Sequence, residues 1–149
     1  MTISAFVIGL GKIGLGYDLE KPIGAFTLTH CRALKEHPGI EFLGASDKSA
    51  EKCSVCRTLY DIDVSTEFSS LLAALRPDLV VIACPTDAHY DVLVEVLEAC
   101  SPKYILCEKP LSYFAPESVK IVEVCKARGV ELFVNYMRTS NPGFIEIRN

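Results

Sequence analysis

The chain has 149 residues, carries a net charge of −4 and is half hydrophobic. This length suits a single domain, which buries about two thirds of the surface that its unfolded chain exposes. No basic run interleaved with aromatic residues points to nucleic acid, and no apolar stretch approaches the ~20 residues of a membrane span. The first residues also lack the charged start and the small-residue cleavage site of a signal peptide. We expect a mildly acidic, soluble protein.

The seven cysteines predict a reduced, cytoplasmic protein. Their number is odd, and four of them sit in apolar patterns where a free thiol behaves as a small hydrophobic side chain (Cys84, Cys100, Cys107 and Cys125). Cys53 and Cys56 form a C-x-x-C pair, which occurs in redox motifs and in halves of zinc sites. No second Cys or His pair at a matching spacing accompanies them. We therefore expect two thiols on one helix and no metal site.

An apolar run at residues 3–8 leads directly into Gly9-Leu10-Gly11-Lys12-Ile13-Gly14. A strand followed at once by G-x-G-x-x-G is the pattern of a dinucleotide-binding turn. Gly9 would allow the tight turn, Gly11 would let the backbone approach a pyrophosphate, and Gly14 would permit close packing of helix on strand. Backbone N–H groups in and beyond the turn, including those of Lys12 and Ile13, would face the phosphates. The turn therefore predicts that the chain binds NAD, with NADP as the alternative.

Strands and helices alternate along the rest of the chain. Apolar runs predict strands at residues 3–8, 40–45, 62–64, 79–84, 104–107 and 130–134. Helical spacing and end signals predict helices at residues 25–37, 50–60, 67–75 and 116–128, with another after residues 85–87. Residues 15–24 contain helix breakers, so we interpret them as an insertion behind a short helical turn at residues 11–15. The alternation predicts an α/β fold with a doubly wound, mainly parallel, six-stranded Rossmann sheet in one domain.

Asp47 follows the second predicted strand and has two compatible interpretations. An acid at this strand tip accepts hydrogen bonds from both hydroxyls of the adenosine ribose. It follows the glycines at more than the usual distance of about 20 residues, and the insertion explains the excess. Asp also favours the N-cap of a helix, here the helix that follows directly. An ionised Asp47 favours NAD, whereas the neighbouring Lys48 tolerates the 2′-phosphate of NADP.

Polar side chains gather at the carboxyl ends of the predicted strands, where ligands bind in such sheets. They are Asp47 after the second strand, Thr86 and His89 after the fourth, Glu108 and Lys109 after the fifth, and Asn135 and Arg138 after the sixth. Pro110 favours an extended Lys109 and allows a cis bond, which would aim the lysine into the crevice. The alternatives are an ordinary exposed Glu-Lys pair and a packed or exposed helical His89.

Four groups of residues stand out in chain order. They are Gly9-Leu10-Gly11-Lys12-Ile13-Gly14, Cys84-Pro85-Thr86 with His89, Cys107-Glu108-Lys109-Pro110-Leu111, and Val134-Asn135-Tyr136-Met137-Arg138. From Ile3 to about Pro142 the chain thereby resembles the glucose–fructose oxidoreductase/inositol dehydrogenase (Gfo/Idh/MocA) family. The resemblance implies an NAD(P)-binding domain of an oxidoreductase that acts on a sugar, sugar derivative or polyol by hydride transfer.

The resemblance also implies a role for each site residue. It gives Lys109 a catalytic or substrate-orienting role and Glu108 a hydrogen bond to the nicotinamide-side ribose. Cys84, Pro85 and Thr86 would line the dinucleotide with His89 near them, and Asn135 and Arg138 would face the substrate. The lysine assignment is physically sensible, because an ammonium stabilises developing alkoxide charge and orients a hydroxyl over the nicotinamide.

Members of that family continue into a second α/β domain, so we expect residues 1–139 to form the dinucleotide-binding domain and residues 140–149 to start the crossing into an absent second domain. By itself the chain would then bind cofactor without full catalysis. It would also expose apolar surface around the sixth strand and residues 144–147, which favours a homo-oligomer. The alternative is a free-standing nucleotide-binding or regulatory Rossmann module without activity. Residues on the substrate side, such as Lys109 and Asn135, favour the enzyme.

Overall fold

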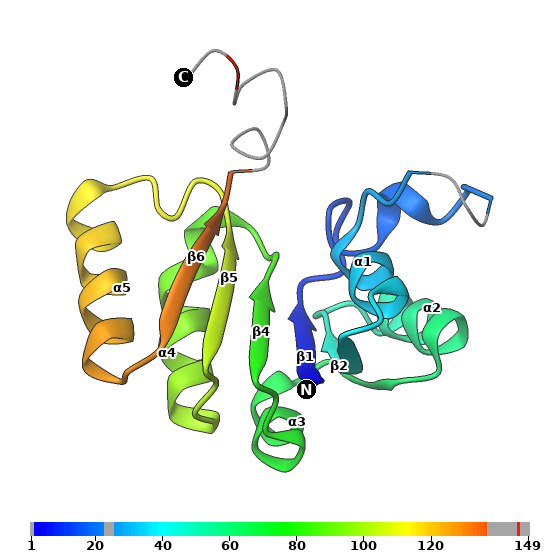
Figure 1. Ribbon diagram of the computed structural model, residues 1–149, viewed down its shortest axis with the longest axis horizontal. Helices are drawn as coiled ribbons and strands as arrows, with labels where there is room; N and C mark the ends of the chain where they lie inside the picture. The colour runs from blue at the N-terminus through cyan, green and yellow to red at the C-terminus, as the bar shows by residue number, and fades with distance from the viewer. Residues whose placement is uncertain (1, 23–25, 137–145, 147–149) are drawn as a thin grey trace.

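The computed structural model describes residues 2–22, 26–136 and 146. They form a six-stranded sheet in the order β3-β2-β1-β4-β5-β6, and every neighbouring pair is parallel (Figure 1). The strands are Ile3–Ile8 (β1), Ile40–Ser46 (β2), Asp63–Ser65 (β3), Leu79–Ile82 (β4), Tyr104–Glu108 (β5) and Glu131–Asn135 (β6). The helices are Gly16–Asp18 (η1), His30–Glu36 (α1), Ala50–Tyr60 (α2), Phe68–Leu75 (α3), Thr86–Ala88 (η2), His89–Ala99 (α4) and Ala115–Ala127 (α5). The predicted doubly wound parallel sheet is confirmed.

Helices cover both faces of the sheet, α1 and α2 on one side and α3, α4 and α5 on the other (Figure 1). Successive residues of β1 enter opposite cores, with Phe6 and Ile8 on the α3–α5 side and Ala5 and Val7 on the α1–α2 side. Neighbouring side chains of a strand point to opposite faces, so a strand buried on both faces needs a continuous apolar run. This requirement explains the sequence of β1.

The centre of the sheet is the pair of β1 and β4. From β1 the chain proceeds to β2 on one side, and from β4 it proceeds to β5 on the other. The strand order therefore reverses between β1 and β4. Ligands of open α/β sheets bind at this point, outside the carboxyl ends of the strands.

The predicted helix at residues 25–37 was wrong at its start, because α1 begins only at His30. Thr29 is the N-cap residue, with extended backbone angles of φ −118° and ψ 152°. Asp18 of the insertion holds it there, since its carboxylate accepts hydrogen bonds from the N–H groups of Leu28 and Thr29 and from the Thr29 hydroxyl. Burial opposes ionisation of Asp18, but these bonds outweigh it and lower its pKa. The insertion therefore sets where α1 starts.

The other predicted elements lie within one or two residues of the observed ones. The third strand is shifted by one residue towards the C-terminus, since Asp63, Val64 and Ser65 pair with β2. The single helix expected after residues 85–87 consists of η2 followed by α4. Within the described ranges, no helix is long and apolar enough to cross a membrane.

The two cysteines of the C-x-x-C pair are buried thiols of α2 that pack into the core beneath α1. The Cys53 thiol donates to the carbonyl oxygens of Asp47 and Ser65. All seven cysteines are free. In the part of the chain that the structure describes, no group of three or more His, Cys, Asp or Glu side chains is arranged to hold a metal ion.

Candidate functional site

The glycine turn joins β1 to the insertion at the centre of the sheet. Gly9 has φ +101°, and a Cβ there would lie 2.6 Å from the Ala83 carbonyl oxygen and the Cys84 nitrogen of the loop after β4. A Cβ on Gly14 would overlap the carbonyl oxygen of Gly9. Both positions therefore exclude any larger residue, as predicted for the tight turn and for the close packing behind it.

Gly11 differs from these two glycines, because a Cβ there would meet no atom within 4 Å. The expected helical turn is present, since the Leu15 N–H donates to the Gly11 carbonyl oxygen at 2.9 Å. Lys12 in this turn is exposed, and Ile13 lines the cavity described below. The space in front of Gly11 is thus open, as the approach of a pyrophosphate would require.

The carboxylate of Asp47 binds the backbone on both sides of the site. Oδ2 accepts from the Leu10 N–H at 2.7 Å and Oδ1 accepts from the Ser49 N–H at 2.9 Å. The N-cap of α2 is Ser49, so the N-cap interpretation of Asp47 was wrong. Lys52 adds an ion pair at 3.4 Å. Asp47 therefore braces the glycine turn from the end of β2.

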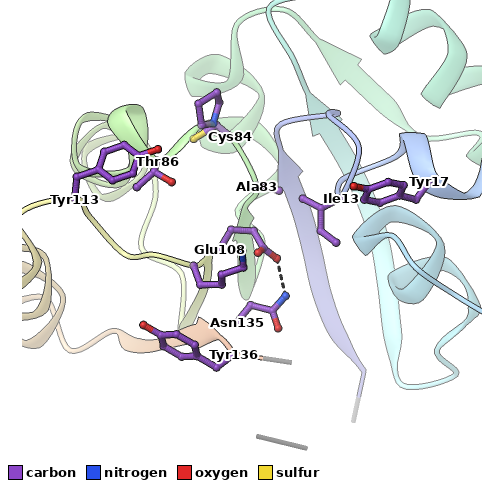
Figure 2. Close-up of a pocket in the computed structure, with 11 residues that line it drawn as sticks. Ile13, Tyr17, Ala83, Cys84, Thr86, Glu108, Tyr113, Asn135 and Tyr136 are labelled. Atoms are coloured by element: carbon purple, nitrogen blue, oxygen red, sulfur yellow. Dashed lines mark hydrogen bonds between the residues drawn. The ribbon is translucent and has the colours of Figure 1, made fainter. Parts of the chain in front are cut away.

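A cavity of about 840 Å³ lies at the carboxyl ends of β4, β5 and β6, beside the glycine turn (Figure 2). Its walls come from five segments and comprise Ile13, Tyr17, Ala83, Cys84, Pro85, Thr86, Glu108, Lys109, Tyr113, Asn135 and Tyr136. The exposed Lys109 is followed by a cis peptide bond to Pro110. The structure therefore brings the predicted Glu-Lys pair, the loop after β4 and Asn135 together around one cavity.

Glu108 receives two hydrogen bonds on the same oxygen. Nε2 of His30 lies 2.7 Å from Oε1. Nδ2 of Asn135 donates to the same oxygen at 2.6 Å, and Figure 2 shows this second contact as a dashed line. Burial opposes ionisation of Glu108, but these two bonds outweigh it, so the pKa of the carboxyl lies below its ordinary value. Glu108 is therefore an ionised acceptor at the cavity wall at neutral pH.

His89 lies beneath the loop after β4 and lines neither of the cavities described here. Its side chain is fully buried, and its two ring nitrogens lie 3.1 Å from the carbonyl oxygens of Leu111 and Cys84. The ring thus joins the segment after Lys109 to the loop after β4. The place of His89 near the dinucleotide stays a prediction, and because both ring nitrogens face backbone carbonyl groups, His89 would act there through the loop that it supports.

A second cavity of about 250 Å³ lies on the other side of the glycine turn, where Gly9, Asp47 and Lys48 line it. Thr66, Glu67 and Glu95 contribute further polar groups to its wall. Cys84 lines both cavities, so the two adjoin. Burial raises the pKa of the Cys84 thiol to about 11, which keeps it neutral and makes it a lining group rather than a nucleophile.

Sequence reasoning did not name several residues of the site. Tyr17, Ala83, Tyr113 and Tyr136 line the larger cavity, and His30 binds Glu108. No local pattern marks Tyr17 or Tyr113 as site residues, whereas Tyr136 lies in the group Val134-Asn135-Tyr136-Met137-Arg138 without having been given a role. The only signal for His30 was its place near the start of the first helix after the glycine turn. Arg138, predicted on the substrate side, lies outside the described residues.

Two adjoining cavities flank a glycine turn whose centre is open, and a carboxylate stands on each side of it. The open turn between two cavities fits the pyrophosphate and the two halves of a dinucleotide. The parallel sheet and this site define a dinucleotide-binding Rossmann domain. A family model described as "Oxidoreductase family, NAD-binding Rossmann fold" (GFO_IDH_MocA) matches residues 3–136. The chain belongs to this family, which confirms the resemblance in the sequence.

Relatives of known name agree with this assignment. The chain is 26% identical over 153 residues to an inositol 2-dehydrogenase of Salmonella paratyphi B, which covers 100% of this chain and 41% of that protein. A Bordetella pertussis dehydrogenase in complex with NADH and UDP-GlcNAcA has a TM-score of 0.82 at 21% sequence identity. The match covers 99% of this chain and 41% of that chain. A 3-ketoreductase of Actinomadura kijaniata in complex with NADP and TDP-benzene has a TM-score of 0.80 at 21% sequence identity. The match covers 99% of this chain and 41% of that chain. The chain thus spans about two fifths of the length of these relatives.

Proposed function

We propose that this chain is the cofactor-binding part of an NAD(P)-dependent dehydrogenase that acts on a polyol, a sugar or a sugar derivative. The observation that carries the proposal is the pair of adjoining cavities on the two sides of the glycine turn, with Glu108 and Lys109 in the larger one. A dinucleotide has two unequal halves joined by a pyrophosphate, and this arrangement matches its shape. The names of the relatives support a polyol or sugar-derived substrate.

The proposal assigns each residue a place along the dinucleotide. Gly9, Gly11, Lys12, Ile13 and Gly14 face the pyrophosphate, and Asp47 binds the adenosine ribose. Cys84, Pro85 and Thr86 border the nicotinamide half, and Glu108 accepts a hydrogen bond from its ribose. Asn135 acts through Glu108, because its amide donates to that carboxylate. The role that the sequence predicted for Asn135 is a place on the substrate side, and its position in the cavity wall is consistent with that role as well.

Lys109 is the proposed catalytic residue. Bound NAD(P) would supply a nicotinamide that takes up the hydride of the substrate alcohol carbon. The Lys109 ammonium would hold the reacting hydroxyl and stabilise the negative charge that develops on its oxygen as the hydroxyl proton passes to solvent water, to which Lys109 is exposed. The walls of the larger cavity would fix the substrate relative to this ammonium.

The setting proposed for the protein is the cytoplasm, which the seven free thiols support. We also propose that it forms homo-oligomers. Phe133 on the edge strand β6 is 50% exposed, and Val119 and Val122 of α5 are 55% and 49% exposed, so apolar surface is available there. Residues 144–147 were expected to add to this surface. Their apolar members, Phe144, Ile145 and Ile147, lie outside the described residues.

Replacing Gly11 by Val should abolish NAD binding and leave folding intact. The valine side chain would enter the open space in front of the turn, where the pyrophosphate is proposed to lie, and it would meet no protein atom near its Cβ. Titration calorimetry with NAD and NADH measures the loss, and urea denaturation checks that unfolding stays cooperative. The matched control is Gly16→Ala, whose Cβ would be in ordinary contact 3.6 Å from the Gly11 oxygen. Undiminished NAD binding by Gly11→Val would place the cofactor elsewhere.

NAD should bind more tightly than NADP. The smaller cavity is lined by the carboxylates of Asp47, Glu67 and Glu95 against the single cation of Lys48, and carboxylates repel a 2′-phosphate. Asp47→Asn removes one negative charge but keeps an oxygen that can accept from the Leu10 N–H. We expect it to shift the NADP-to-NAD affinity ratio about tenfold towards NADP at low salt.

The control for this prediction is Glu51→Gln, which removes an exposed carboxylate of α2 that lines neither cavity. Calorimetric dissociation constants for both cofactors give the ratio for each variant. Equal affinities for NAD and NADP in the unmodified chain, unchanged in Asp47→Asn, would contradict the prediction.

A further inference from the structure

His30 lies against Glu108 although 78 residues separate them in the sequence. It is the first residue of α1, and its N–H donates to the Ile13 carbonyl oxygen at 3.0 Å. The next N–H, of Cys31, donates to the Gly14 carbonyl oxygen at 3.0 Å. The start of α1 is therefore attached to the glycine turn, and from there the His30 ring reaches the end of β5.

Two side chains from opposite directions converge on one carboxylate oxygen. His30 comes from α1 and Asn135 from the end of β6, and both lie within 2.7 Å of Oε1 of Glu108. The side chains of His30 and Glu108 are each only 12% exposed. An ionised carboxylate accepts hydrogen bonds and cannot donate, so Nε2 of His30 carries the hydrogen in this contact. The orientation of the carboxylate is therefore fixed by two elements of the fold.

The charge of Glu108 depends on these partners. Burial favours the neutral acid, and the hydrogen bonds of His30 and Asn135, together with the charge that His30 can carry, hold its pKa below the ordinary 4.5. Burial raises the pKa of the adjacent Cys107 thiol to about 12, so that thiol is neutral. Lys109 follows Glu108 directly, and among the described residues the other ionisable groups that line the larger cavity are Cys84, Tyr17, Tyr113 and Tyr136.

We propose that His30 is a positioning residue for the dinucleotide, because its ring holds the Glu108 carboxylate in place at the wall of the larger cavity. The inference rests on the proposed function and deepens it. One imidazole ring links the turn that faces the phosphates to the carboxylate that receives the nicotinamide-side ribose. Loss of the ring leaves Asn135 as the single side-chain donor to Glu108 among the described residues.

The link itself is measured on the ligand-free protein by carbon-13 NMR titration of the Glu108 carboxyl group. In the unmodified chain its midpoint should lie below 4.5. In His30→Leu the midpoint should rise, because burial is then opposed by the hydrogen bonds of Asn135 and of the Lys109 backbone without the contribution of His30. His30→Gln offers an amide N–H in place of Nε2 and should restore most of the difference. His37→Leu, at the exposed far end of α1, should leave the midpoint unchanged.

Two results of this titration would overturn the link. One is a midpoint at or above 4.5 in the unmodified chain, a measurement that does not depend on the folding of any variant. The other is a His30→Leu midpoint equal to that of the unmodified chain.

NAD affinity provides the second readout. At pH 7 His30→Leu should bind NAD about tenfold more weakly, the usual effect of losing a hydrogen bond to a charged group. His30→Gln and His37→Leu should stay near the original affinity. Since an ionised Glu108 accepts from the ribose more strongly than the protonated acid does, NAD affinity is highest above the Glu108 midpoint and is lost as the pH falls through it. That loss should therefore occur at higher pH in His30→Leu than in the unmodified chain.

The outcomes separate this inference from the proposed function. If the NMR midpoints behave as expected but the unmodified chain does not bind NAD, the proposed function fails and the positioning role falls with it, while the His30–Glu108 link stands. If the unmodified chain binds NAD and His30→Leu binds it equally well with the same pH profile, the positioning role is overturned and the proposed function stands.

Discussion

Gly14→Ala should lower the free energy of unfolding by about 3 kcal/mol or more, a large share of the total stability of a domain of this size. The new Cβ would overlap the Gly9 carbonyl oxygen and lie 3.2 Å from the Leu10 Cα. These are backbone atoms that cannot rotate away. Gly9 is itself held by the hydrogen bond from its N–H to the Ser46 carbonyl oxygen at 2.8 Å. The clash must therefore displace the end of β1 or the turn behind it.

Gly11→Ala is the matched control for this experiment. Its Cβ would meet no atom within 4 Å, and its φ lies outside the left-handed region. We expect stability equal to that of the unmodified chain or higher by up to about 1 kcal/mol, because alanine restricts the unfolded chain more than glycine does. Urea denaturation followed by circular dichroism measures both variants. Equal stabilities for Gly14→Ala and Gly11→Ala would refute the role given to Gly14.

The glycine turn and the sheet were predictable because each depends on neighbouring residues. Gly14 is required by the backbone of Gly9 and Leu10, Gly9 is favoured by its own positive φ, and the apolar runs of β1 and β4 follow from burial on both faces. Parallel pairing then follows from the alternation of strands and helices. The strand-end rule also placed Glu108, Lys109 and Asn135 at one site, and the structure brings them together around one cavity.

The parts that were not predictable depend on contacts between distant residues. Nothing near Asp18 shows that it binds Thr29, so the start of α1 was placed too early. The contact of His30 with Glu108 spans 78 residues and has no local signature. His89 followed the family pattern, but only the fold shows that its ring is buried between two backbone carbonyl groups.

Asp47 shows an intermediate case. Its position at the end of β2 was enough to predict a place beside the adenosine ribose, and it does line the smaller cavity. The sequence did not show that its oxygens also accept from the N–H groups of Leu10 and Ser49. A test by Asp47→Ala would therefore mix a change of cofactor preference with a loss of both contacts, whereas Asp47→Asn keeps an oxygen for the Leu10 N–H of the turn and loses only the acceptor for the Ser49 N–H.

The 149 residues by themselves should bind NAD but produce NADH from polyols or sugars at a background rate. Hydride transfer needs the substrate carbon held against the nicotinamide, and correct orientation is worth roughly 7–11 kcal/mol of the barrier. Lys109 is exposed at the cavity wall, where the high dielectric of water weakens its stabilisation of an alkoxide. The relatives carry more than half of their length beyond the region that this chain matches.

In a protein that continues these residues with a C-terminal region such as the relatives carry, turnover should appear, and Lys109→Ala should then lower kcat about 100-fold or more. Lys120→Ala, which removes an exposed ammonium from α5 away from the cavity, is the matched control and should keep full activity. NADH absorbance during turnover measures both variants, and calorimetry should show that Lys109→Ala still binds NAD. The loss then lies in the chemical step rather than in cofactor binding. Substrate-dependent NADH formation by the 149 residues alone would contradict this account, because the cavity around Lys109 would then be sufficient to hold and orient a substrate.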